Sequence, residues 1–171
     1  MFQTRTTAAE RVRLDPLRLD HAEQMVDVLA DPGLYDVIGG QPPSLSVLRA
    51  RYRRQLAGPH GDETWLNWII VVDEQPVGYV QATITTSDTG ATADLAWLLA
   101  VSAQRHGYAS EAASAAVAQL REQGVTTFTA HIAAHHSPSE RVARRIGMRP
   151  AGIEERGEQV WQLKVAPDSG T

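Results

Sequence analysis

The stretch Leu98–Ala112 constrains the fold more than any other part of the chain, because a strand pattern there runs into a helix pattern. An apolar run ends at Leu99, a short polar loop follows, and small apolar residues then recur at helical spacing from Tyr108 onward. A strand that leads directly into a helix is typical of a sheet whose strands are crossed by helices on one face. The stretch therefore predicts a β/α fold with a helix N-terminus beside a strand end.

The loop Gln104–Ala109 has the chemistry of an anion site. The first amides of a helix have no partner inside the helix, and the helix dipole is positive at that end. Gly107 and Ala109 allow a bulky polyanion to approach the backbone, and a pyrophosphate is the natural ligand. Neither the dinucleotide fingerprint G-x-G-x-x-G nor the nucleoside triphosphate loop G-x-x-x-x-G-K-S/T is present. An ordinary strand-to-helix turn is the alternative interpretation.

Strand and helix patterns alternate along the chain without internal repeats or an interior linker. Residues 1–9 and about 167–171 are predicted to be frayed ends. Helix patterns begin at residues 20, 44, 108 and 137. Strands are predicted over residues 11–17, 65–72, 77–86, 92–99, 126–132, 150–154 and 159–165.

Two helix starts carry capping signals. Asp20, with Glu23 three residues later, predicts a capping arrangement, and Ser44 predicts a second N-cap. The helix after Ser44 carries a run of basic residues beside its apolar stripe, which is typical of a solvated face: Arg49, Arg51, Arg53 and Arg54.

Composition and charge restrict the class of protein. The 171 residues contain 16 Lys and Arg against 20 Asp and Glu, a net charge of −4, which argues against a nucleic-acid surface. The absence of Cys excludes disulfides, thiolate metal sites and cysteine nucleophiles. No apolar run reaches the ~18 residues of a membrane helix, and the first residues lack the apolar core of a signal peptide. We therefore expect a cytoplasmic protein with one domain over residues 1–171 and neither a nucleic-acid nor a membrane partner.

Several segments along nearly the whole chain resemble one known family. Gln104-Arg105-His106-Gly107-Tyr108-Ala109 matches the signature Q/R-x-x-G-x-G/A of the GNAT-type acyl-CoA N-acyltransferases. The resemblance is to the branch of ribosomal-protein alanine acetyltransferases and aminoglycoside N-acetyltransferases. The other segments that resemble this branch are Glu10–Leu14, Val77–Ala82, Asp94–Trp97 and His136–Met148.

The resemblance implies both a fold and a cofactor. The expected fold is a mixed, strongly bent central sheet of about seven strands flanked by about four helices. Acetyl-CoA would lie where the strand ending at Leu99 splays from the strand ending at Ile132, and a backbone N–H near Leu99 would hold the thioester oxygen. The residues that the resemblance assigns to the cofactor are Trp97, Leu98, Leu99, Gln104, Arg105, His106, Gly107, Tyr108, Ala109, Ser110, His136 and Ser139.

The resemblance also implies direct attack of an amine on the acetyl carbon, without a protein nucleophile. Asp94 stands where several family members carry an acidic base, and a structural acid is the alternative. His136 stands where the family motif often has Asn, and it is the second catalytic candidate because His titrates near neutral pH. A histidine at a helix start without a chemical role is the alternative. Many members place a Tyr acid where this chain has Ala143. The leaving thiolate would therefore take its proton from another group or from water, which a thiol pKa near ~8.5 permits.

The sequence restricts the acceptor only loosely. Family architecture places Tyr35, Trp65 and Trp68 around the acceptor pocket, with core packing as the alternative for the tryptophans. Acidic loop residues favour a cationic amine such as an aminoglycoside or polyamine, although they are also typical of solvated loops. These residues are Asp36, Asp62, Glu63 and Asp88.

We expect a small-molecule primary amine as acceptor, with a protein N-terminus as the alternative. The sequence is also compatible with a catalytically silent acyl-CoA-binding module, with an unrelated nucleotide-binding protein and with an enzyme that uses aminoacyl-tRNA. No metal is expected, because no ligand motif such as H-E-x-x-H accompanies the histidines. A homodimer is common in the family.

Overall fold

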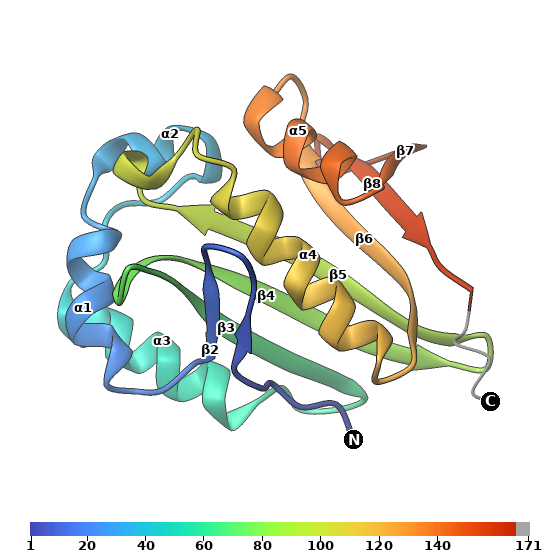
Figure 1. Ribbon diagram of the computed structural model, residues 1–171, viewed down its shortest axis with the longest axis horizontal. Helices are drawn as coiled ribbons and strands as arrows, with labels where there is room; N and C mark the ends of the chain where they lie inside the picture. The colour runs from blue at the N-terminus through green and yellow to red at the C-terminus, as the bar shows by residue number, and fades with distance from the viewer. Residues whose placement is uncertain (167–171) are drawn as a thin grey trace.

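The computed structural model describes residues 1–166; the predicted fraying of residues 167–171 lies outside the described residues. An eight-stranded sheet forms the centre, with helices on both faces (Figure 1). The strands are β1 (Thr7–Ala8), β2 (Arg13–Pro16), β3 (Glu63–Val72), β4 (Gln75–Ser87), β5 (Gly90–Leu99), β6 (Val125–Ala133), β7 (Arg149–Glu155) and β8 (Glu158–Lys164). The α-helices are α1 (His21–Val28), α2 (Tyr35–Ile38), α3 (Leu45–Ala57), α4 (Tyr108–Arg121) and α5 (Ser137–Arg145), and the 3-10 turns are η1 (Pro32–Leu34) and η2 (Val101–Ala103).

The predicted mixed α/β fold is confirmed, with eight strands in place of about seven and five α-helices in place of about four. The short helix α2 is an element that the sequence patterns did not predict. No helix within residues 1–166 is long and apolar enough to cross a membrane.

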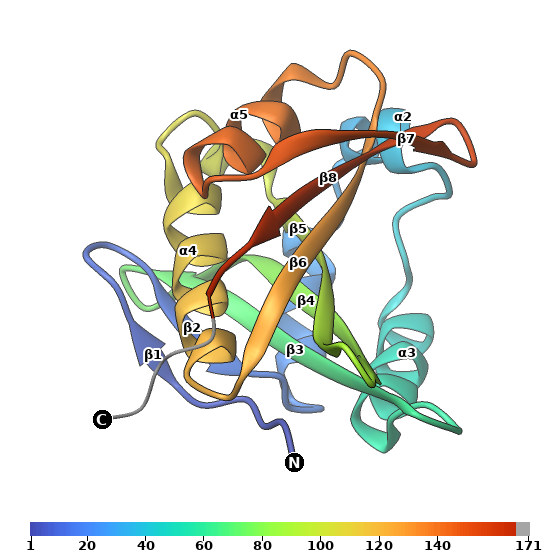
Figure 2. The ribbon, with the colours of Figure 1, turned by 90° about the vertical axis from the view of Figure 1, so that its right-hand side faces the viewer.

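The sheet has one parallel pair, and that pair opens into a wedge. The strand order is β1-β2-β3-β4-β5-β6-β8-β7, and only β5 and β6 are parallel, joined by the crossover helix α4. These two strands pair from Ala91 to Asp94 on β5 and from Val125 to Thr129 on β6. Beyond that point β6 continues with β8, and β5 continues with β4. The second half of β5 therefore has one open edge, and β6 and β8 turn away from it (Figure 2).

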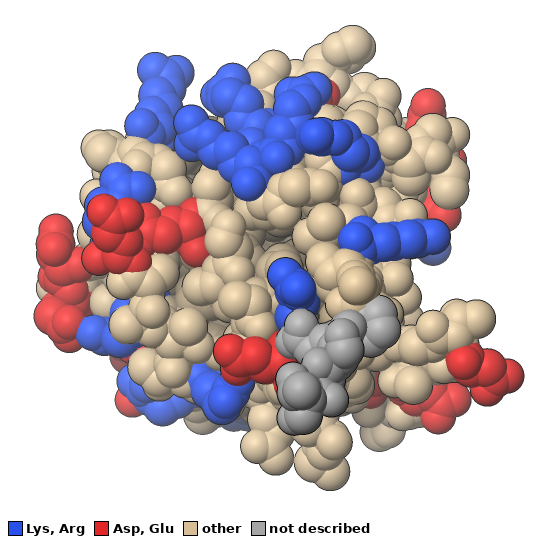
Figure 3. Space-filling model, turned by 45° about the vertical axis from the view of Figure 1, so that its right-hand side comes forward, with Lys and Arg blue, Asp and Glu red and all other residues tan. Residues whose placement is uncertain are grey.

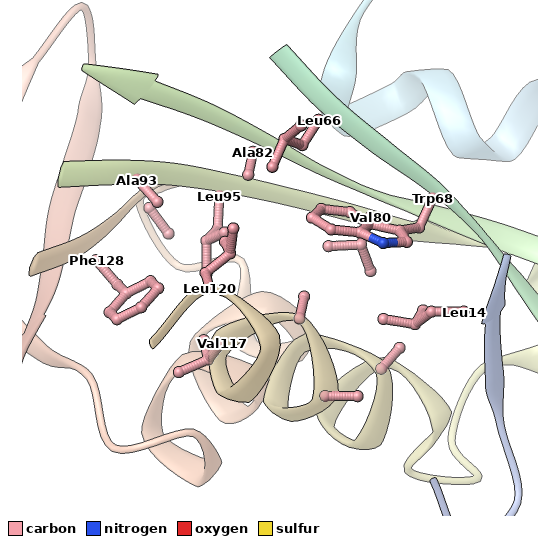
Figure 4. Packing of buried hydrophobic residues seen from close by; sticks show 14 of the residues in the cluster. Leu14, Leu66, Trp68, Val80, Ala82, Ala93, Leu95, Val117, Leu120 and Phe128 are labelled. Atoms are coloured by element: carbon pink, nitrogen blue, oxygen red, sulfur yellow. The ribbon is translucent and has the colours of Figure 1, made fainter. Parts of the chain in front are cut away.

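Two hydrophobic cores hold the helices against the sheet. The larger core lies between α4 and one sheet face, where Val117 and Leu120 of α4 meet Trp68, Val80 and Phe128 (Figure 4). Burial of each large side chain of this kind stabilises the fold by about 1.5–3 kcal/mol. The smaller core lies on the opposite face, beneath α1 and α3.

One predicted helix cap is confirmed and the other is wrong. The hydroxyl of Ser44 accepts a hydrogen bond from a backbone N–H in the first turn of α3 at 3.3 Å. Asp20 precedes α1 but makes no capping hydrogen bond, because its carboxylate accepts from the Arg18 guanidinium at 3.0 Å. Glu23 forms an ion pair with Arg49 of α3 instead of reaching back to the start of its own helix.

The predicted fraying of residues 1–9 is wrong. Residues 7 and 8 form β1, which pairs with β2. Two glutamines hold the segment before β1, one on α4 and one just beyond its end. Gln119 exchanges hydrogen bonds with the backbone of Arg5 at 2.9 Å, and Gln123 exchanges them with the backbone of Gln3 at 2.8 and 3.0 Å. The N-terminal segment is therefore fixed by side chains distant in the sequence.

Candidate active site

The loop between β5 and α4 has the geometry of an anion site. Gly107 precedes α4 with φ +84° and ψ 5°, a left-handed conformation that glycine adopts without steric cost. The first helical hydrogen bond runs from the Glu111 N–H to the Gly107 carbonyl at 3.1 Å, so the three amides before Glu111 point out of the helix end. A left-handed residue followed by helical ones forms a concave nest of N–H groups.

Two arginines from other parts of the chain lie beside this nest. A Cβ atom added to Gly107 would lie 3.2 Å from Nη2 of Arg11 and 3.7 Å from Nη1 of Arg145. Arg11 is held in place because its Nη1 donates to the His106 carbonyl at 2.9 Å and its Nε donates to Glu111 at 3.0 Å. Figure 3 shows basic side chains gathered at the top of the face that carries α5. Positive charge thus surrounds the helix N-terminus.

Neither arginine was identified from the sequence, because each comes from a segment far from the signature. Glu111, in the first turn of α4, forms an ion pair with Arg11. Burial alone would raise the pKa of Glu111, but hydrogen bonds from the backbone N–H groups of Arg11 and Val12 and from the Arg11 side chain hold it below its ordinary value.

Side chains of the signature loop support its shape. The Gln104 amide donates to the Leu99 carbonyl at 3.2 Å, which ties the loop to the end of β5. The His106 Nδ1 lies 2.8 Å from the Gln104 carbonyl, and the His106 and Tyr108 rings stack at 5.3 Å. These side-chain contacts stabilise the loop. Within the described residues, the backbone N–H groups at the start of α4 make no hydrogen bond and can donate to a ligand.

The open edge of β5 leads straight to this loop. Trp97 is half-buried against the core under α4, Leu98 is buried in the core under α1 and α3, and Leu99 is buried in the core under α4. The side chains of these three residues thus pack into the hydrophobic cores on the two faces of the sheet. The backbone of the same residues pairs with β4 on one side and has no strand partner on the side of β6.

An acid–histidine–acid chain closes the other end of the wedge. Asp94 lies in the last paired row of β5 and β6, where its Oδ1 accepts from the Thr129 hydroxyl at 2.8 Å. The same oxygen lies 3.1 Å from Nδ1 of His131, and Nε2 of His131 lies 3.0 Å from the Glu155 carboxylate. The hydrogen bond to Glu155 raises the pKa of His131; burial opposes that rise, and the nearby charge of Asp94 adds to it.

His131 and Glu155 were not identified as site residues from the sequence. In the sequence, His131 is one of the histidines that no metal-ligand motif accompanies. Within residues 1–166, no group of three or more His, Cys, Asp and Glu residues is placed to hold a metal ion. Only the pairing of β6 with β8, and of β8 with β7, brings Glu155 against this histidine.

The ion pair predicts a measurable titration. In NMR titrations of the folded protein we expect the His131 ring to have a pKa above its ordinary value of 6.5, and Glu155→Gln to lower it. Because the folded pKa exceeds the unfolded one, the stabilisation from this pair is fully present below pH 6.5 and is lost as the pH rises through the folded pKa. The neighbouring Glu154→Gln is the control and should leave the midpoint unchanged. Equal midpoints in the wild-type and Glu155→Gln chains would contradict the pairing.

His136 and Ser139 lie together at the start of α5. The Nδ1 of His136 lies 2.8 Å from the Ser139 hydroxyl. The imidazole that contacts Asp94 is that of His131, five residues earlier in the sequence, and not that of His136. Ala143 is fully buried, so this helix offers no acid at the position where many family members carry Tyr.

The three residues predicted for the acceptor pocket are not brought together. Trp65 lies in register with Thr83 and Asp94 on the sheet face away from α4. Trp68 is three residues further along β3 and therefore points to the opposite face, where it is 0 % exposed in the core under α4. Trp68 is therefore a core residue. Tyr35 donates its hydroxyl to the Leu29 carbonyl at 2.8 Å, at the edge of the smaller core.

Comparison with known proteins agrees with this architecture. The family model described as the acetyltransferase (GNAT) domain matches residues 11–149. The chain therefore belongs to the GNAT acetyltransferase family. A search of curated proteins by sequence found no match.

Solved structures share the fold at low sequence identity. RimL, a ribosomal L7/L12 α-N-protein acetyltransferase in complex with coenzyme A, superposes with a TM-score of 0.81 at 16% identity, over 96% of this chain and 100% of that chain. The aminoglycoside acetyltransferase AAC(6')-Ib with coenzyme A gives 0.74 at 18% identity, over 90% and 94%. A GNAT-family acetyltransferase from Bacillus anthracis gives 0.73 at 19% identity, over 94% and 98%.

Proposed function

We propose that this chain is an acetyl-CoA-dependent N-acetyltransferase whose acceptor is a small-molecule primary amine. The observation that carries the proposal is the continuity of the open edge of β5 with the amide nest at Gly107. An extended pantetheine arm needs a free strand edge, and a pyrophosphate needs a helix N-terminus. Both are present within one β/α unit, and structural neighbours hold coenzyme A.

The polyanionic end of the cofactor has a defined set of partners in this proposal. The amides of Tyr108, Ala109 and Ser110 would donate to the pyrophosphate, and Arg11 and Arg145 would neutralise its charge. Arg105 is exposed in the same loop and adds a third cation. Backbone groups of β5 at Trp97, Leu98 and Leu99 would pair with the arm, and one N–H would hold the thioester oxygen.

Asp94 is the proposed proton acceptor. Bound acetyl-CoA supplies the thioester carbonyl that the amine attacks. The attacking nitrogen must lose a proton, and Asp94 stands where the wedge closes. Its Oδ1 is engaged by Thr129 and His131, and no hydrogen bond within residues 1–166 occupies Oδ2. Oδ2 can therefore accept the proton, directly or through a water, while His131 holds the carboxylate in place.

His136 has a supporting part in the proposal, as a cofactor contact beside Ser139. Since Ala143 offers no proton, the departing sulfur would be protonated by solvent or by this histidine. A thiol pKa near ~8.5 makes water sufficient at neutral pH.

The cofactor assignment is tested by thermal denaturation with acetyl-CoA, CoA, ATP and NAD. At about a hundred times its Kd, a ligand of the folded state stabilises it by about 2.7 kcal/mol. We expect that shift with acetyl-CoA and CoA only. A shift with ATP or NAD instead, or no shift with CoA, would contradict the proposal.

A matched pair of glycine variants locates the site. Gly107→Ala strains a residue at φ +84° and places a methyl group in the nest, so CoA should no longer raise the melting temperature. Gly124→Ala, just beyond the other end of α4, strains a residue at φ +92° but meets no atom within 4 Å. The Gly124→Ala variant should lose similar stability and keep its full response to CoA.

A further inference from the structure

A cavity lies on the sheet face opposite α4, between α1, α3 and the strands β3 and β4. Its volume is about 110 Å³, enough for a small polar group. Leu17, Leu29 and Ile69 supply apolar walls. The polar side chains that line it come from α3, β3 and β4: Arg51, Tyr52, Gln55, Asn67, Tyr79 and Gln81.

One of these polar side chains is buried without a hydrogen-bond partner, and four others make no side-chain hydrogen bond within residues 1–166. Tyr52 is only 4 % exposed, and its hydroxyl is buried with no hydrogen-bond partner within the described part of the chain. No side-chain hydrogen bond or ion pair within residues 1–166 engages Arg51, Gln55, Asn67 or Gln81. An unpaired buried polar group is costly, and nearly all such groups in proteins are satisfied by protein, water or a ligand. The buried hydroxyl of Tyr52 therefore marks the cavity as a candidate site for a polar group.

The charge of the residues that line the cavity indicates which kind of ligand group would bind there. Arg51 is the only charged residue in its lining. The predicted solvated face of α3 is thus only partly correct, since Arg53 and Arg54 are exposed but Arg49 and Arg51 are half-buried. Burial raises the pKa of Tyr52 and of Tyr79, so both hydroxyls remain protonated at neutral pH and can donate. Guanidinium, amide and phenol donors without an opposing acid suit an oxyanion.

The cavity lies on the sheet face under α1 and α3, and β4 separates it from β5. Asn67 on β3 is in register with Gln81 on β4, which is in register with Ala96 on β5. Ala96 belongs to the stretch of β5 that has no partner on the side of β6. Since neighbouring strands lie about 4.8 Å apart and the open edge is on the far side of β5, a group bound over β3 or β4 would lie roughly 7–12 Å from a nitrogen attacking there.

We infer that this cavity binds a carboxylate of the acceptor, so that the acceptor is a small amino acid-like molecule with its amine and carboxylate roughly 7–12 Å apart. This inference rests on the proposed N-acetyltransferase function and narrows its substrate class. Arg51 pairs with the carboxylate, and the Tyr52 hydroxyl donates to it. A polycationic acceptor such as an aminoglycoside would instead place like charge against Arg51.

The kinetic test compares matched acceptors: glycine, β-alanine, γ-aminobutyrate, δ-aminovalerate and ε-aminocaproate, each beside its carboxamide. CoA release gives kcat/KM for each pair. We expect one of the longer acids to exceed its amide on the order of 10- to 100-fold, as for a charged hydrogen bond. Arg51→Gln should abolish that preference, and Arg53→Gln, on the exposed face of α3, should keep it. Acetylation of acids and amides at equal rates would overturn the inference and leave the proposed function intact.

A binding measurement decides the inference without turnover. Calorimetry of the same acids and amides on the CoA-saturated protein should give tighter binding of an acid to the wild type, and not to Arg51→Gln. No preference for any acid in the wild type, or an equal preference in Arg51→Gln, would overturn the inference. Tyr52→Phe should keep or raise the melting temperature of the ligand-free protein while it weakens carboxylate binding. A purely structural Tyr52 would lose stability and leave binding unchanged.

Discussion

Replacement of Gly78 with alanine is expected to destabilise the protein by about 3 kcal/mol or more, the upper end of the cost of overpacking. A Cβ atom at Gly78 would lie 2.0 Å from the Leu98 carbonyl oxygen and 3.0 Å from the Leu99 Cα, both backbone atoms that no rotamer change can move. The strands β4 and β5 would have to separate at this point. Chemical denaturation of the purified variant measures the loss.

The control for Gly78→Ala is Gly152→Ala on the exposed strand β7. Gly152 has φ +73° and no atom within 4 Å of a built Cβ, so its variant carries backbone strain of about 1–2 kcal/mol without a clash. If Gly78→Ala were no less stable than this control, the close approach of the β5 backbone to Gly78 of β4 would be contradicted. Any Gly78→Ala protein that folds should also bind CoA weakly, because the clash displaces the open edge of β5.

Replacement of Asp94 with asparagine is expected to lower kcat/KM on the order of 10²-fold, the lower end of what a positioned general base contributes. The amide side chain keeps the size of the carboxylate and an oxygen that can accept from Thr129, so the fold should be retained. The loss should shrink for acceptor amines of low pKa, which reach the site already deprotonated. CoA release across amines of graded pKa measures this.

The control for Asp94→Asn is Glu155→Gln. This variant removes the carboxylate that pairs with His131 but leaves the proposed base, Asp94, in place. We expect it to change the pH profile through His131 while costing much less in rate. The proposal would be contradicted if Asp94→Asn kept kcat/KM within about threefold of wild type, because a general base contributes far more than that. Asp94 would then be only a structural partner of Thr129 and His131.

Local sequence patterns determined most of the secondary structure and the geometry of the proposed anion site. The Ser44 cap, the hairpin turn between β3 and β4 and the start of α4 at Gly107 each depend on residues within one or two turns of each other. The signature Gln104–Ala109 is local in the same sense: its helix end and left-handed glycine need no distant partner to form.

The tertiary structure decided which side chains surround the wedge. Arg11 meets the His106 carbonyl across 95 residues, and Glu155 reaches His131 across 24. Trp65 and Trp68 differ in role because strand residues three apart face opposite sides, and only the packing of α4 decides which side is the core. In the sequence, Arg51 is one of several arginines on a helix face predicted to be solvated, and only the packing of α3 over β3 and β4 brings it into the cavity lining. Helix ends, turns and strand alternation are short-range properties of the chain, whereas strand neighbours and helix–sheet contacts bring together groups that no local pattern relates.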